Sequence, residues 1–310
     1  MTTISSEHIK QCALEVGFHA CGIAKASHLS DFESTLGTWL SLGFGADMQY
    51  MQRNSAKRSN PRLLYSGARS VISLLLSYNP SRVIDGPYKI ARYAYSDDYH
   101  LRIKRMLFEL IAALQLHYPD FKARPFVDTA PISDKRWAAA AGLGWIGRNS
   151  LLISPQYGSF CNIGEIVTEF EVDRYDEPLA NHCGNCRLCL QSCPNHALQL
   201  VDGRYMLNAA CCTAYNTIEN RQSTLPDTLR THGYAFGCDI CQEVCPYNAD
   251  APCPFEVSDE KISRLQGLFY ANESQFNHAV RHTPISRITF NQWRRNLRHV
   301  CSDLQKNLTS

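Results

Sequence analysis

Cysteine residues occur in two closely spaced runs in the second half of the chain. The earlier run has the pattern Cys-x2-Cys-x2-Cys-x3-Cys-Pro, and the later one has the pattern Cys-x2-Cys-x3-Cys-Pro. Thiolates with two residues between them can wrap one iron–sulfur cubane from a single tight loop, while the fourth thiolate reaches a second cubane. The spacing therefore predicts two [4Fe–4S] clusters. Their candidate ligands are Cys183, Cys186, Cys189, Cys193, Cys238, Cys241 and Cys245.

An eighth ligand is needed because the later run lacks a first cysteine of its own. In the arrangement of a bacterial ferredoxin, one cluster is held by Cys183, Cys186, Cys189 and Cys245. The other is held by Cys193, Cys238, Cys241 and either Cys211 or Cys212. Zinc knuckles use two Cys-x2-Cys pairs, and disulfides require an oxidising, secreted context, so neither alternative fits the pattern as well.

The composition is that of a globular protein in a reducing compartment. The chain has 310 residues, of which 45% are hydrophobic and 19% charged, which fits one large or two modest domains. Its apolar run over residues 71–76, interrupted only by Ser73, is far shorter than the roughly 20 residues that span a bilayer. The N-terminus shows neither a secretory signal nor a twin-arginine motif. We therefore expect a cytoplasmic protein with no membrane partner.

Hydrophobic periodicity predicts mixed helices and strands ahead of the cysteine runs. A first helix is expected from Ser5 or Ser6 to Gly17, a second over 31–42, and a basic connecting loop over 50–61. A further helix follows residue 100, with a buried stripe of Leu101, Met106, Leu107, Leu110, Ile111 and Leu114. Strands are predicted at 18–24, 70–78, 125–127, 150–153 and 160–172.

Asp128 follows the predicted strand 125–127 and precedes a helix that begins after Pro131. Catalytic carboxylates are often found at the end of a strand, but the same position is an ordinary helix cap. From the residues alone both interpretations remain open, and the cap is favoured.

Three glycines between residues 142 and 147 match the dinucleotide-binding pattern G-x-G-x-x-G. The context differs from that of a nucleotide site, because the pattern follows a predicted helix and leads into a predicted strand. We therefore expect these glycines to let the backbone approach a large ligand closely.

The C-terminal segment is basic, although the formal net charge of the whole chain is only +2. Residues 281–310 contain six Arg and Lys residues and one Asp. A solvated helix face is one interpretation of this pattern, and phosphate binding is the other. The candidate phosphate ligands are Arg287, Arg294, Arg295 and Arg298.

Several segments together resemble the tRNA epoxyqueuosine reductase family, whose members are cobalamin-dependent iron–sulfur enzymes. Besides the two cysteine runs, the matching segments are Ala91-Arg-Tyr-Ala, Asp98-Tyr-His100, Phe126-Val-Asp-Thr-Ala-Pro131, Ala141-Gly-Leu-Gly-Trp-Ile-Gly147, Tyr157-Gly-Ser159, Tyr215, Thr217-Ile-Glu219 and Thr283-Pro-Ile-Ser-Arg287. This combination extends over most of the chain and is far more specific than any single motif.

The resemblance implies an α+β fold in three parts. A nitroreductase-like, cobalamin-binding catalytic domain would occupy residues 1–177, and a ferredoxin-like domain with two [4Fe–4S] clusters would occupy 178–255. A short helical basic segment would follow over 256–310. Longer family members carry a C-terminal helical-repeat extension, so the sequence resembles their short form.

The same resemblance implies the reduction of epoxyqueuosine to queuosine at the wobble position of tRNA, as the last step of queuosine biosynthesis. Asp128 matches the family's proton donor, for which burial would have to raise the pKa so that the carboxyl is protonated near pH 7. Cys212, rather than Cys211, matches the family's cluster ligand. The positions that would face cobalamin are Arg58, Arg92, Asp128, Leu152, Ile163 and Asn220.

The expected partners are tRNA, through its anticodon stem-loop, and an external electron donor, with the protein acting as a monomer. Two other functions are compatible with parts of the pattern. A cobalamin-dependent reductive dehalogenase shares the two clusters but normally carries an export signal. A plain ferredoxin-like electron carrier would leave the first 175 or so residues without a purpose.

Overall fold

Four strands form an antiparallel sheet at the centre of the N-terminal part, in the order β1-β2-β7-β4. The computed structural model describes residues 3–128 and 130–308. The strands are β1 (Ala20–Lys25), β2 (Ser70–Ser77), β4 (Ala123–Phe126) and β7 (Cys161–Thr168). β2 is buried along its whole length, as expected for an apolar strand at the middle of a sheet covered on both faces.

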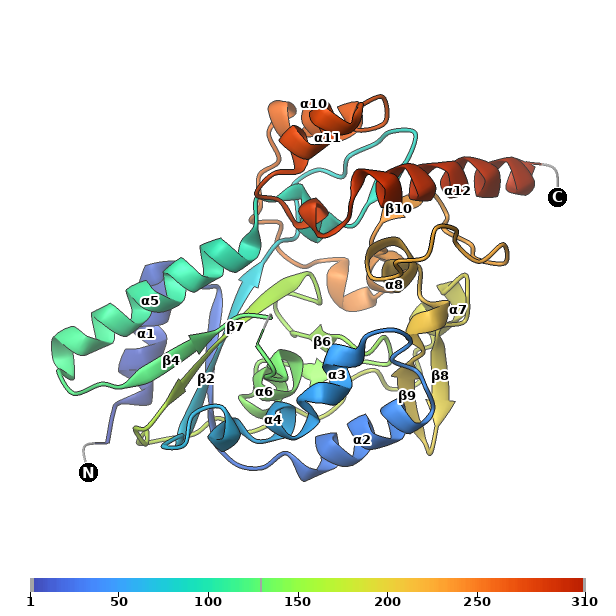
Figure 1. Ribbon diagram of the computed structural model, residues 1–310. Helices are drawn as coiled ribbons and strands as arrows, with labels where there is room; N and C mark the ends of the chain where they lie inside the picture. Colours follow the sequence, from blue (N-terminus) through green and yellow to red (C-terminus); the bar gives the residue numbers. More distant parts are fainter. Residues whose placement is uncertain (1–2, 129, 309–310) are drawn as a thin grey trace.

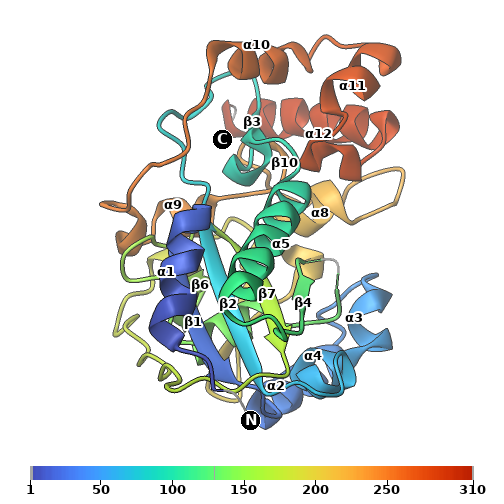
Figure 2. The ribbon, with the colours of Figure 1, turned by 90° about the vertical axis from the view of Figure 1, so that its left-hand side faces the viewer.

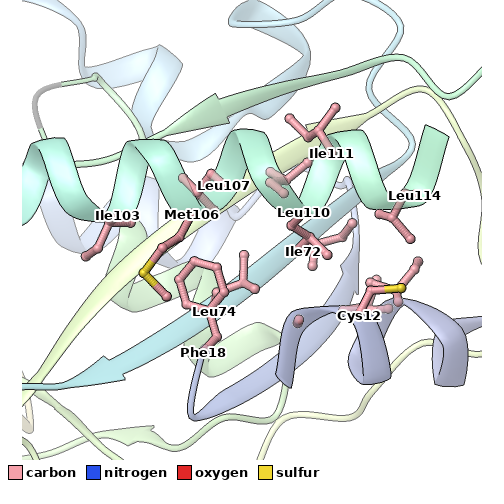
Figure 3. Close-up of a cluster of buried hydrophobic side chains, with 14 of the residues drawn as sticks. Cys12, Phe18, Ile72, Leu74, Ile103, Met106, Leu107, Leu110, Ile111 and Leu114 are labelled. Carbon is pink, nitrogen blue, oxygen red and sulfur yellow. The ribbon is translucent and has the colours of Figure 1, made fainter. Parts of the chain in front are cut away.

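Two helices, α1 (Ser6–Val16) and α5 (Tyr99–His117), cover one face of this sheet (Figure 2). The side chain of Ser5 caps α1 by accepting a hydrogen bond from the backbone N–H of His8. Gly17 ends the helix in the left-handed conformation, with φ of 102°, which favours glycine. Figure 3 shows the buried stripe of α5 facing β2 and α1, so the helix spacing of apolar residues is what builds this core.

The opposite face is covered by α6 (Asp134–Ala140), which packs Trp137 and Ala138 against the sheet (Figure 1). A small hairpin follows, formed by β5 (Trp145–Ile146) and β6 (Leu152–Ile153). A Cβ atom at Gly144 or Gly147 would collide with Ile153 of this hairpin. Close packing within the chain itself therefore requires glycine at these two positions, and the approach of a large ligand there stays a prediction.

The cysteine-rich region contains short elements joined by long loops. Its elements are α7 (Leu188–Ser192), β8 (Leu198–Val201), β9 (Arg204–Leu207), η3 (Ala209–Cys211), α8 (Thr213–Ile218), α9 (Ile240–Glu243) and η4 (Pro246–Asn248). The β8–β9 hairpin lies beside α2 (Ser30–Ser41) (Figure 1). The indole N–H of Trp39 donates to the carbonyl of Leu207 over 2.7 Å and ties the two elements together.

The C-terminal helices share a core with an earlier part of the chain. They are α10 (Asp259–Gly267), α11 (Glu273–Val280), η5 (Pro284–Arg287) and α12 (Phe290–Leu308). Strand β10 (Tyr234–Phe236) pairs in parallel with β3 (Lys89–Ile90), and their side chains pack with Trp293 of α12. Residues 256–310 therefore have a core built jointly with residues near 90, not a core of their own.

Most of the predicted elements are present, with two differences. The segment 50–61, expected to be a loop, contains α3 (Gln49–Arg53), α4 (Ser55–Ser59) and the start of η1 (Pro61–Leu63). A further short helix, η2 (Arg92–Tyr95), precedes α5. Leu101, expected in the buried stripe of α5, is 60% exposed. Within the described ranges, no helix has the length and apolar character needed to cross a membrane.

The two leucines on α5 allow a matched test of this core. Leu110 is fully buried, so Leu110→Ala should lower the free energy of unfolding by about 2–5 kcal/mol through lost burial and a residual cavity. Leu101→Ala removes the same atoms from an exposed position and should change the free energy of unfolding by less than about 0.5 kcal/mol. Urea unfolding followed by circular dichroism measures both, and similar losses in the two variants would contradict the packing of α5.

Candidate active site

A histidine lies between two carboxylates where α5 begins. The ring nitrogen Nδ1 of His100 is 2.7 Å from an Asp98 oxygen, and Nε2 is 3.1 Å from Oδ2 of Asp128. Asp98 is also the N-cap of α5 and accepts a hydrogen bond from the backbone N–H of His100. The hydroxyl of Tyr99 donates to the same Asp128 oxygen over 2.8 Å. Both ring nitrogens thus face acceptors, which is the arrangement that a protonated imidazole satisfies.

Asp128 does not act as a helix cap. α6 begins six residues later and has Ser133 at its N-cap position. The backbone of Asp128 has φ of 36°, in the left-handed region that is uncommon for residues other than glycine. Strained conformations of this kind cluster at functional sites. The capping interpretation of Asp128 is therefore wrong, and the catalytic one stays a prediction.

The hydrogen bonds of this group favour a proton on His100 over one on Asp128. The hydrogen bond from His100 lowers the pKa of Asp128 below its ordinary value, against the effect of burial. Burial opposes a charge on His100, but its hydrogen bonds with Asp128 and Asp98 outweigh this and raise the pKa of the imidazole. The expectation of a raised pKa for Asp128 is therefore wrong, because it did not include the histidine.

Asp128 lies in a recess of the protein. Its side chain is 60% exposed to solvent, yet burial acts on its neighbours. Lys135 is exposed, although burial lowers its pKa to about 8, and burial raises the pKa of the nearby Asp134 to about 8. These side chains reach solvent but are largely surrounded by protein atoms, and we call the space at their edge the recess. A pocket of about 200 Å³ adjoins it at Lys135 and is also lined by Met51 and Ser150, among others.

The recess contains buried polar atoms without hydrogen-bond partners among the described residues. They include Oδ1 of Asp134 and Nε of Arg58, and both groups interact electrostatically with Asp128. Buried polar atoms are nearly always satisfied in native proteins, so unpartnered ones indicate a missing partner. A large ligand with many amide groups, such as cobalamin, fits this requirement.

The other positions expected to face cobalamin are held in different ways. Leu152 and Ile163 pack in one apolar cluster beside α6. Arg92 lies over the ring of Phe160, with 4.5 Å from the guanidinium carbon to the ring centre, and pairs with a carboxylate of α9. Asn220 is buried, and its carbonyl accepts hydrogen bonds from α12. The structure thus brings Arg58 and Asp128 together, and it brings Leu152 and Ile163 together.

The cysteines interact electrostatically within two sets. The outer set, so named because Cys186 is exposed, consists of Cys183, Cys186, Cys189 and Cys245. The inner set consists of Cys193, Cys212, Cys238 and Cys241. In the described part of the chain, no three His, Cys, Asp or Glu side chains converge closely enough for one metal ion. Each thiolate of a [4Fe–4S] site binds a different iron, so a wider spacing is what such a cluster needs.

The inner set adjoins the recess. Burial raises the pKa of the Cys241 thiol far above its ordinary value, and the charge of Lys135 interacts with this same thiol. Lys135 also interacts with the charge of Asp128, so it connects the inner set with the Asp128 side of the recess. The motif Asp98-x-His100 was the sequence signal for this site, but spacing alone assigned no role to His100, Asp134 or Lys135.

The four arginines of the C-terminal segment that were expected to bind phosphate differ in their exposure to solvent. Arg294 and Arg298 are exposed on α12. Arg287 makes a bidentate ion pair with Glu219, at 2.9 and 3.0 Å. Its positive charge also contributes to lowering the pKa of Asp128. Arg295 is only 5% exposed, and its guanidinium donates to three backbone carbonyls and to the side chain of Asn296. The expectation of a phosphate contact at Arg295 is therefore wrong, because its donors are already used inside the protein.

Two segments match models of known families. Residues 58–129 match epoxyqueuosine reductase QueG, DUF1730, and residues 182–248 match the 4Fe-4S double cluster binding domain. An epoxyqueuosine reductase of Leadbetterella byssophila is 37% identical over 95% of this chain and 98% of its own length. That of Cellulophaga algicola is 42% identical over 78% of this chain and 79% of its own length.

Solved structures agree with these relatives. The epoxyqueuosine reductase of Streptococcus thermophilus has a TM-score of 0.83 and 26% identity, covering 96% of this chain and 81% of that one. A crystal structure of epoxyqueuosine reductase with a tRNA-Tyr epoxyqueuosine-modified stem loop has a TM-score of 0.80 and 26% identity. It covers 96% of this chain and 80% of that one. Fold and site thus define an oxidoreductase with two iron–sulfur clusters beside a catalytic α+β layer. The chain belongs to the epoxyqueuosine reductase family.

Proposed function

We propose that the protein reduces epoxyqueuosine to queuosine at the wobble position of tRNA, which is the last step of queuosine biosynthesis. The observation that carries this proposal is the Asp98–His100–Asp128 group, together with a lysine, Lys135, that interacts both with Asp128 and with Cys241 of the inner cysteine set. Removing an epoxide oxygen as water consumes two electrons and two protons, so such an enzyme needs an electron store and an acid in one place. The similar structure solved with an epoxyqueuosine-modified stem loop supports the same substrate.

The outer and inner cysteine sets are assigned as the ligands of the two [4Fe–4S] clusters. Cubanes transfer one electron at a time, and two of them in sequence can deliver the pair of electrons that the reaction needs. In this assignment Cys212 completes the inner set, whereas Cys211 does not take part.

Arg58 and Asp134 would hold cobalamin through their unpartnered polar atoms, with Leu152 and Ile163 offering apolar contacts near α6. The chemistry that cobalamin supplies when bound is a low-valent cobalt centre able to pass two electrons to the epoxide. The protein's own contribution is to enclose the recess and to keep Asp128 and Lys135 at its edge.

The acid is the protonated His100 acting through Asp128. The imidazole holds the proton, and Asp128, at 3.1 Å from Nε2, is the side chain exposed toward the recess. As the departing oxygen gains negative charge, Nε2 of His100 gives its proton to Asp128, and Asp128 passes a proton to that oxygen. Asp98 stabilises the charge of His100 from the other side until this transfer.

Exposed Arg294 and Arg298, together with Arg287 near the recess, would contact tRNA phosphates. We infer that the enzyme acts as a monomer in the cytoplasm and receives electrons from an external donor. Fourteen cysteines without a disulfide among the described residues are compatible with a reducing compartment.

Activity should depend on the protonation of His100. Because its pKa is raised, the charged form exists below that pKa, and turnover of an epoxyqueuosine stem loop should fall as pH rises through it. Asp128→Asn and His100→Gln should each lower turnover by about 10²–10⁴-fold, and His100→Gln should also remove the fall of turnover with rising pH.

The control for both variants is Asp120→Asn, at an exposed position after α5, which should behave as wild type. Losses under about tenfold, with clusters and cobalamin bound, would remove the pair from the acid role.

The ligand assignment can be tested by iron content. Anaerobically reconstituted wild type should bind about eight irons, as two cubanes require. Cys212→Ser should retain about half of this iron because the inner set loses a ligand, while the adjacent Cys211→Ser should stay near eight. If Cys211→Ser is the variant that loses iron, the assignment is reversed.

Arg294 and Arg295 are neighbours in sequence with different expected roles. Arg295→Met leaves buried carbonyls unsatisfied and should lower the free energy of unfolding by about 3 kcal/mol. Arg294→Ala should leave stability unchanged but weaken stem-loop binding. The slope of the logarithm of the binding constant against the logarithm of salt concentration should become shallower by about 0.7–0.9. Binding measured at several salt concentrations decides this, and an unchanged slope would exclude Arg294 as a phosphate ligand.

A further inference from the structure

An arginine-lined groove lies beside the outer cysteine set. Two adjoining hollows, of about 420 and 470 Å³, share Asp31, Arg136, Ile146 and Asn181 as lining residues. The larger hollow reaches Gly184 in the loop between Cys183 and Cys186. We propose that this groove and the exposed outer loop form the docking surface for an acidic one-electron carrier protein. The proposal rests on the proposed function, whose external donor it identifies by class.

Arg148 fixes the outer loop against the groove. Its guanidinium donates to the carbonyl of Cys186 and, over 2.7 Å, to that of Gly184. The loop can turn back on itself here because Gly184 adopts a φ of 48°, with open space where a side chain would be. The ligand loop of the more exposed cluster is thus held at the rim, within reach of a partner bound in the groove.

The groove carries an excess of positive charge. Arg136, Arg148 and Arg204 line it against one carboxylate, Asp31, which Arg204 binds at 2.7 Å. Among the residues with described positions, neither Arg136 nor Arg148 has a carboxylate within ion-pair distance. Arg187, next to Cys186, is exposed as well. Since the whole chain has a net charge of only +2, this is a local feature, and it would attract a negatively charged surface.

Two apolar side chains flank the same loop. Leu179 is 39% exposed at one hollow, and Leu188, which begins α7, is 43% exposed. Protein interfaces commonly combine a small apolar centre with a charged rim, and transient redox complexes are among the smallest. Charge complementarity in such complexes mainly accelerates association, which suits a donor that must arrive twice for each substrate.

The positions of the outer and inner cysteine sets indicate the order in which the clusters would receive electrons. In each encounter the carrier is oxidised by one electron, and the outer cluster is reduced by one. The inner set lies next to Lys135 and the recess, so the electron moves inward from there. Two encounters supply the two electrons of one deoxygenation, and the two protons come from the acid group and solvent. The carrier takes no part in the chemistry of the substrate.

The test compares a protein donor with a small reductant. Clusters of the reconstituted holoenzyme are reduced anaerobically either by a reduced acidic [2Fe–2S] ferredoxin or by dithionite, and their bleaching is followed by stopped flow. At low salt, Arg187→Glu and Arg204→Glu should each slow reduction by ferredoxin about tenfold or more, and salt should slow the wild type toward the same rate. Reduction by dithionite should not change. Arg105→Glu, an exposed arginine on α5, is the control.

Three results would overturn the proposal. They are an unchanged rate with ferredoxin, an equal slowing with dithionite, and a loss of cobalamin affinity in place of slower reduction. The last would assign the arginines to the cofactor. Dithionite-driven conversion of the stem loop tests the proposed function separately, because it does not depend on any docked carrier.

Discussion

The pair of contacts that His100 makes with two carboxylates is the interaction on which the rest of the site depends. Asp98 is committed to α5 as its cap, so it anchors one side of the imidazole to a fixed helix. Asp128 follows β4, and its backbone in the left-handed region places its carboxylate next to Nε2. With the charge satisfied on both sides, a protonated histidine is stable where burial alone would have neutralised it.

The surroundings of this group are assembled from distant parts of the chain. The sheet and α6 supply the wall that carries Asp134 and Lys135, and the cysteine-rich region supplies Cys241 opposite. Arg295 of α12 donates hydrogen bonds to one carbonyl in α8 and to two in the segment that follows it. The C-terminal helix thus holds the end of α8 and the chain after it in place.

The sequence was most informative where the relevant contacts are local. Cysteine spacing, the Ser5 cap and the Gly17 stop each depend on a few neighbouring residues, and the expected elements are present. Prediction failed where a property depends on residues far away in the chain. The pKa of Asp128 is determined by His100, 28 residues earlier, and a run of basic residues cannot reveal that Arg295 points inward. Likewise, the stripe on α5 could not show that Leu101 lies beyond the edge of the core.

The position of His100 in the first turn of α5 has a consequence for how the enzyme loses activity. Helix ends open locally with a far smaller free energy than the whole protein needs to unfold. Any opening of this first turn separates the imidazole from Asp98 and breaks the charge-stabilising chain, while the buried stripe further along α5 keeps the fold intact. A molecule whose first turn has opened is therefore folded but lacks the contact that holds His100 at Asp98. On warming, catalysis should decline while the global fold is still complete, and a tighter first turn would extend the working temperature without changing the core.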